Sequence, residues 1–89
     1  MNHIVLIDSP GKDGYSHMVS DNIEFLHIFA EQIEVKRCWF QNKRNKKTGK
    51  SKNQPHYDVK HDKFQSAINN GAILVDSKTI IDFLKEHYE

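Results

Sequence analysis

The hydrophobic positions of the chain form short runs that predict three strands. Residues 4–7 are aliphatic throughout and stop at an Asp-Ser-Pro-Gly turn, and residues 72–75 form a second aliphatic run. Short apolar runs bounded by turn residues are typical of buried strands. Residues 35–41 are rich in aromatic and β-branched side chains, which favours a third strand between these two.

Three other stretches have the apolar spacing of amphipathic helices. The first begins at Asp21, which has the capping-box spacing to Glu24, and it ends near Ile33. The second is closed by Gly71, a typical residue just after a helix C-terminus. The third follows the Asp-Ser pair at 76–77, whose side chains can cap it.

Strands and helices therefore alternate in the order β-α-β-α-β-α, which favours parallel pairing through right-handed crossovers. We expect a single α/β domain over residues 1–89, with a small, three-stranded, mainly parallel sheet covered by helices. Residues 42–54 contain six lysine and arginine side chains and no apolar residue, so they predict a flexible basic loop.

Composition narrows the class of protein. The net charge of +1 argues against a uniformly basic protein that coats nucleic acid. One cysteine, Cys38, excludes an internal disulfide and favours a reducing, cytoplasmic compartment. We expect Cys38 to be buried in the central strand. No apolar stretch approaches the roughly 20 residues that span a bilayer, so we expect a soluble protein without a membrane partner.

Four residues are candidates for catalysis because of where the predicted strands end. Ligands bind open parallel sheets beyond the carboxyl ends of the strands. Asp8 closes the first strand, and His17, His56 and Asp58 lie on segments expected to adjoin the same edge. Carboxylates there can bind metal or act as bases, and histidines can carry protons. The alternative is that Asp8 caps a turn and the histidines are surface residues.

A second group of residues is a candidate for binding phosphate or a base. Lys63 in a first helical turn opposes the helix dipole unless an anion is bound. Aromatic side chains such as Trp39 can stack on bases, although core packing is the commoner role for them. Lysines of the basic loop would attract phosphates whatever the base sequence, or would simply be solvated. The candidate ligand-binding residues are Trp39, Lys46, Lys47, Tyr57, Lys60 and Lys63.

No contiguous motif in the sequence identifies a reaction. The sequence has no nucleophile elbow, phosphate loop, dinucleotide fingerprint or CxxC pair. His17 and His56 match no contiguous zinc spacing, so a divalent metal would need a third ligand from Asp8 or Asp58. His27, at the margin of an apolar helix face, favours a structural role.

Several segments together resemble a family of small uncharacterised domains found in bacteriophage and bacterial genomes. The most specific are Trp-Phe-Gln at 39–41 and His-Tyr-Asp at 56–58, with Asp8, Ser-His-Met at 16–18 and Gly-Ala at 71–72. The resemblance covers nearly the whole chain and implies a phage or bacterial origin and one α/β domain. It carries no activity or cofactor. The stretch between Gln41 and Pro55 is longer and more basic than the family pattern.

Three functions remain open. The first is an accessory protein of a phage or bacterium that binds nucleic acid or a nucleotide through a phosphate-recognising polar edge. The second is a metal-assisted phosphoesterase or nuclease that uses Asp8, Asp58 and a histidine. The third is a module that binds a host protein in the host cytoplasm, for which a homo-oligomer with exposed apolar surface would be typical.

Overall fold

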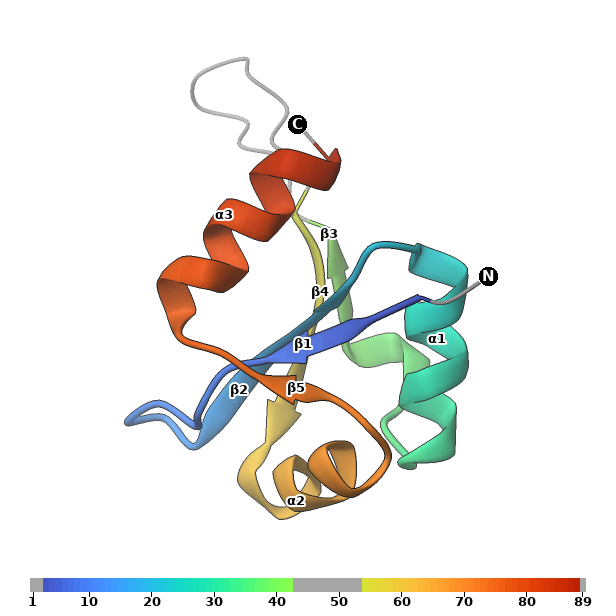
Figure 1. Ribbon diagram of the computed structural model, residues 1–89. Helices are drawn as coiled ribbons and strands as arrows, with labels where there is room; N and C mark the ends of the chain where they lie inside the picture. The colour runs from blue at the N-terminus through green and yellow to red at the C-terminus, as the bar shows by residue number, and fades with distance from the viewer. Residues whose placement is uncertain (1–2, 43–53, 89) are drawn as a thin grey trace.

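The computed structural model describes residues 3–42 and 54–88, which form one mixed sheet with helices on both faces (Figure 1). The strand order across the sheet is β3-β4-β2-β1-β5. The strands are β1 (Val5–Ile7), β2 (Tyr15–Ser20), β3 (Phe40–Asn42), β4 (Pro55–Lys60) and β5 (Ile73–Leu74). The helices are α1 (Ile23–Gln32), α2 (His61–Asn69) and α3 (Ser77–Tyr88), with a 3-10 turn at Arg37–Trp39.

The expectation of a three-stranded, mainly parallel sheet is wrong. Within the described residues the sheet has five strands, and β1 with β5 is its parallel pair. The pairs β1–β2, β2–β4 and β3–β4 are antiparallel. The error arises from β2 and β4, two strands that were not predicted and that pair with each other near the centre of the sheet.

β2 and β4 were missed because their inward positions are only partly apolar. In β2 the buried face includes Ser16 and Ser20, so the expected alternation of apolar and polar side chains is broken. In β4 the buried positions are Pro55, Tyr57 and Val59, separated by polar residues in strict alternation. Proline is tolerated because it is the first residue of its strand.

The predicted central strand at 35–41 is also corrected. The chain makes a 3-10 turn at Arg37–Trp39 and only then enters β3. Trp39 and Phe40 pack against the core while half-buried, which accounts for the aromatic content that suggested a strand. Cys38 lies in the turn and is exposed, contrary to the expectation that it is buried.

The helices agree with the sequence-based predictions better than the strands do. The end of α1 near Ile33 and the closure of α2 by Gly71, whose φ is 109°, are confirmed. The capping residue of α1 differs: Asn22, not Asp21, accepts a hydrogen bond of 2.8 Å from the Phe25 backbone N–H. Asp21 instead accepts a bond of 3.0 Å from the Ile4 backbone N–H. No helix in the described part of the chain is long and apolar enough to cross a membrane.

Two apolar clusters hold the sheet between its helices. The larger lies on the face covered by α1 and α2 and includes Ile7, Met18, Leu26 and Tyr57, all fully buried. The smaller joins Leu6 and Val19 to one side of α3. Figure 1 shows α3 on the opposite side of the sheet from α1. The residues of the smaller cluster come from β1, β2 and α3, so the part of that face formed by β4 and β3 lies outside it.

Candidate functional site

Polar side chains gather on the sheet face beside α3, where β2 and β4 pair. His17 lies directly opposite Asp58 in the antiparallel register, and His56 is on the same face two residues before Asp58. Asp8 follows β1 and lies next to His17, because its backbone N–H donates to the His17 carbonyl at 3.2 Å. We call Asp8, His17, His56 and Asp58 the His-Asp cluster.

The Asp8 side chain is held in place within the cluster, since the residue is only 3% exposed and its carboxylate makes three hydrogen bonds. Its Oδ1 accepts from the His17 backbone N–H at 2.6 Å. Its Oδ2 lies 2.9 Å from His17 Nδ1 and accepts from the Ser77 hydroxyl at 3.1 Å. An ionised carboxylate can only accept, so His17 carries a proton on Nδ1. When the imidazole is neutral, Nε2 then carries no hydrogen and can accept a hydrogen bond.

His56 is oriented in the same way by a different partner. Its Nδ1 lies 2.7 Å from the Gln54 carbonyl oxygen, which can only accept, so Nδ1 carries the proton here too. Its Nε2 lies 3.4 Å from Asp58 Oδ1, and His17 Nε2 lies 4.0 Å from that same oxygen. The other oxygen of Asp58 accepts from the Gln41 amide. Both imidazoles therefore turn Nε2 toward one carboxylate oxygen.

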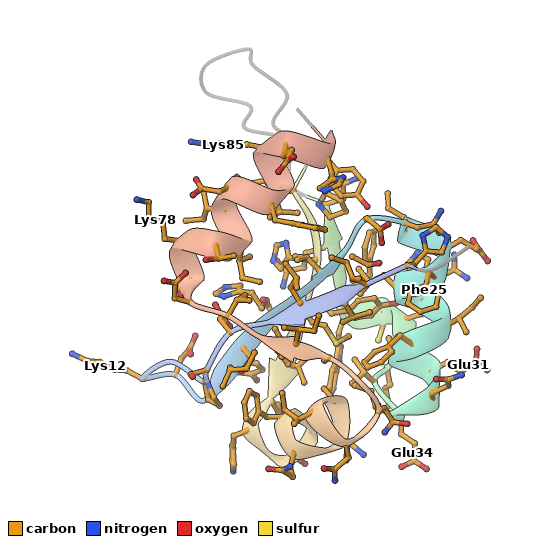
Figure 2. The ribbon with its side chains drawn as sticks, viewed as in Figure 1. Lys12, Phe25, Glu31, Glu34, Lys78 and Lys85 are labelled. Carbon is orange, nitrogen blue, oxygen red and sulfur yellow. The ribbon has the colours of Figure 1, made fainter. Side chains whose placement is uncertain are left out.

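A hollow of about 190 Å³ lies between the cluster and α3. Asp8, His17 and His56 line one side, and the apolar side chains of Ile80, Ile81 and Leu84 line the other. Figure 2 shows the lysines at 78 and 85 of α3 pointing away from the sheet, so this wall brings no cation to the hollow. The pocket is polar at its floor and apolar along the helix.

A second, more open hollow of about 370 Å³ adjoins the other side of Asp58. Lys60 Nζ lies 5.5 Å from the centre of the Trp39 ring, close enough for a cation–π contact. The groove thus combines an aromatic surface with a cation. It is lined by Tyr15, Cys38, Trp39, Gln41, Asp58 and Lys60.

The structure brings all four predicted catalytic residues together, but for a different reason from the one expected. Only the approach of Asp8 to Ser77 comes from a parallel pair, β1 with β5. The other contacts follow from the antiparallel register of β2 and β4, in which side chains two residues apart share a face. The shared edge of parallel strands is thus not what creates the cluster.

The predicted ligand-binding residues are divided by the fold. Lys60 and Trp39 lie together in the open groove. Tyr57 is fully buried on the opposite face of the sheet, where its hydroxyl bonds His27 Nδ1 at 2.6 Å, so its ring cannot stack on a ligand. Lys63 lies on α2 and pairs with Glu34 at 3.4 Å, away from the cluster. Lys46 and Lys47, with most of the predicted basic loop, fall outside the described residues.

Three residues that orient the cluster were not among the predicted site residues. They are Ser77 and Gln41, through their side chains, and Gln54, through its backbone carbonyl. The alternation His-Tyr-Asp-Val in residues 56–59 was the available indication, because it places the histidine and the aspartate on one face of a strand. The bond from Ser77 depends on the β1–β5 pairing and has no local pattern.

The side chains of the His-Asp cluster do not surround a point at metal–ligand distances. Within residues 3–42 and 54–88, no group of three or more histidine, cysteine, aspartate or glutamate side chains could hold a metal ion in the positions that the side chains occupy. What the arrangement offers is two imidazoles that line the hollow beside α3 and a carboxylate, Asp58, that lines the neighbouring groove and lies near both Nε2 atoms. Such groups can transfer protons or become ligands after a small movement.

Comparison with known proteins identifies a family without supplying an activity. No curated protein matches the chain, and no solved structure matches it. A family model described as "Protein of unknown function (DUF4031)" matches residues 5–87, which include every member of the His-Asp cluster and both hollows. By that match over nearly its whole length, the chain belongs to the DUF4031 family.

Proposed function

We propose that this protein is a hydrolase of phosphate esters, of the nuclease or phosphoesterase class, with its reaction centre at the His-Asp cluster. The observation that carries the proposal is the fixed orientation of two imidazoles. His17 and His56 each have Nδ1 held by a buried or backbone acceptor, and each points Nε2 at Asp58. A merely structural pair of histidines has no need of this shared direction.

The cluster favours water as the nucleophile. The serine that lines the pocket, Ser77, donates its hydroxyl proton to Asp8 and not to either imidazole. Water can be activated here either by loss of a proton to an imidazole Nε2 or by a bound cation. Either route adds water to phosphorus and breaks the bond to the leaving alcohol, which takes up a proton.

The groove next to Asp58 supports a nucleotide-like substrate. Lys60 supplies a charge for phosphate, and Trp39 supplies an aromatic surface for a base. The sequence also places six lysine and arginine residues within 43–53, directly after β3. Polyanions are the substrates that such charges attract. The resemblance to phage and bacterial domains supports an accessory role in such a cell, and the single cysteine supports a reducing cytoplasm.

The same groove favours a second candidate function, the binding of a nucleotide or nucleic acid without turnover. The two differ in what the cluster does, because binding alone requires Trp39 and Lys60 but not His17 or His56. A third outcome, neither binding nor turnover, would favour the host-protein module.

The test is a turnover screen with bis-p-nitrophenyl phosphate and with short single-stranded DNA and RNA, with and without added divalent metal. We expect hydrolysis that falls by about 100-fold or more in His56→Ala, because acid–base or ligand groups typically contribute that much. His61→Gln is the matched control, since His61 is an exposed histidine at the start of α2. Salt-sensitive binding with no hydrolysis of any substrate would refute the hydrolase and favour the second candidate.

A further inference from the structure

Three hydrogen-bond acceptors converge at the centre of the cluster with no donor among them. His17 and His56 carry their ring protons on Nδ1, so in their neutral forms both Nε2 atoms present lone pairs. Asp58 Oδ1, 3.4 Å from one and 4.0 Å from the other, is also an acceptor. Acceptors repel one another unless a proton or a cation lies between them.

The surroundings match the partners that fix histidines in metal sites. A metal-bound histidine donates its other ring N–H to a carboxylate or a backbone carbonyl, which sets the tautomer and the ring direction. Asp8 plays this part for His17, and the Gln54 carbonyl plays it for His56. The carboxylate of Asp58 is itself oriented by the Gln41 amide. Each of the three converging groups thus has its own positioning partner.

We infer that His17 Nε2, His56 Nε2 and Asp58 Oδ1 form a binding site for a divalent first-row transition metal of the zinc class. Two imidazoles and one carboxylate are the protein ligands of many catalytic zinc and iron sites, which keep positions open for water or substrate. This inference rests on the proposed function only for its purpose, since it names how the water would be activated. Magnesium is disfavoured because it prefers oxygen ligands.

The spacing of the three atoms defines what must move. Ligand atoms held at about 2.0–2.1 Å from a tetrahedral zinc ion are about 3.3 Å apart. The distance between His56 Nε2 and Asp58 Oδ1, 3.4 Å, already fits, whereas the distance from His17 Nε2, 4.0 Å, is too long. This gap agrees with the absence of a closed metal arrangement in the described residues. The His17 side chain is 52% exposed, so its ring can close the gap without disturbing the core.

The bound cation would change the chemistry of the pocket in one respect. A divalent metal held by these three residues would supply a Lewis acid for a phosphoryl oxygen and would lower the pKa of bound water. The chain's own contribution is to hold the three ligands, to exclude water on the side of Ile80 and Leu84, and to place Lys60 beside the entering phosphate.

The test is calorimetric titration of the full chain, first freed of metal with a chelator, with Zn²⁺, Co²⁺ and Mg²⁺ in the absence of any substrate. We expect one Zn²⁺ or Co²⁺ per chain and weaker or no binding of Mg²⁺. His17→Gln and Asp58→Asn should abolish this binding, whereas His61→Gln should keep it. Asp8→Asn should weaken it by about 10–100-fold, the usual effect of removing a positioning partner.

Folding is checked by circular dichroism for every variant, and His17→Gln is decisive because this exposed side chain is the least needed for the fold. No binding of either metal, or binding that survives both ligand substitutions, would overturn the inference. The two proposals fail separately. Hydrolysis by a protein that binds neither Zn²⁺ nor Co²⁺ would refute the metal site and keep the hydrolase, whereas metal binding without hydrolysis of any substrate would do the reverse.

Discussion

Asp8 shows how one buried carboxylate determines the chemistry of a neighbouring side chain. It accepts from the His17 backbone, the His17 ring and Ser77, so its negative charge is compensated by hydrogen bonds although it is almost fully buried. The sequence indicated Asp8 as a candidate because it follows an aliphatic run. It could not show that Asp8 acts through His17, because that contact depends on a strand that the sequence did not reveal.

His27 and Tyr57 form a different kind of polar pair, on the core side of the sheet. Burial of the ring, and then the nearby Arg37 guanidinium, lower the pKa of His27. Burial also raises the pKa of the Tyr57 phenol. Both groups are therefore held in their neutral forms, joined by the 2.6 Å hydrogen bond. The sequence-based prediction of a structural role for His27 agrees with this placement.

A pH-dependent loss of stability follows from the lowered pKa of His27. As pH falls through about 6.5, the unfolded chain takes up a proton at His27 while the folded protein does not. The stabilisation is therefore fully present above that pH and is lost as pH falls toward the folded pKa. Urea unfolding from pH 7.5 down to about 5 should show this decline, and His27→Gln should reduce it. An unchanged decline in His27→Gln, matching that of His61→Gln, would contradict the assignment.

The strands and helices differ in how clearly the local sequence pattern predicts them. β1 and α3 were predicted because their buried positions are apolar and their boundaries carry turn or capping residues. β2 and β4 were not, because they bury serine, proline and tyrosine and carry the histidines and aspartate of the candidate site at alternate positions. The polar residues of the candidate site thus obscured the strands that carry them. Local pattern is weakest where a strand has both a core face and a chemical face.

The N-terminus of α1 allows an element to be tested by itself. Asn22 accepts from the Phe25 backbone N–H at 2.8 Å, and the helix buries Leu26, Phe29 and Ala30 in the larger core cluster. Asn22→Ala should lower the free energy of unfolding by about 1 kcal/mol, measured by urea denaturation, because one helix N–H loses its partner. Asn22→Ser keeps an acceptor oxygen and should stay close to the unchanged protein. Equal losses in both variants would show that the cap contributes nothing.

At the scale of the whole molecule, the two faces of the sheet differ in how completely helices cover them. One face, under α1 and α2, holds the larger core cluster, and the other is only partly covered by α3. The wrong prediction of parallel strands came from assuming that polar residues far apart in sequence meet at a sheet edge. They meet on a face, because the hairpin of β1 and β2 places β2 against β4. Pairing between distant strands is set by the whole chain and has no local pattern.

The claim on which both proposals depend is that His17 and His56 hold their protons on Nδ1 and turn bare Nε2 atoms toward Asp58. Long-range proton–nitrogen correlation spectra of the imidazole rings measure this directly in nitrogen-15-labelled protein at mildly alkaline pH. His17→Gln and His56→Gln assign the two rings. The account predicts a protonated Nδ1 and an unprotonated Nε2 in both rings. Protonation at Nε2 with a bare Nδ1 in either ring would contradict it.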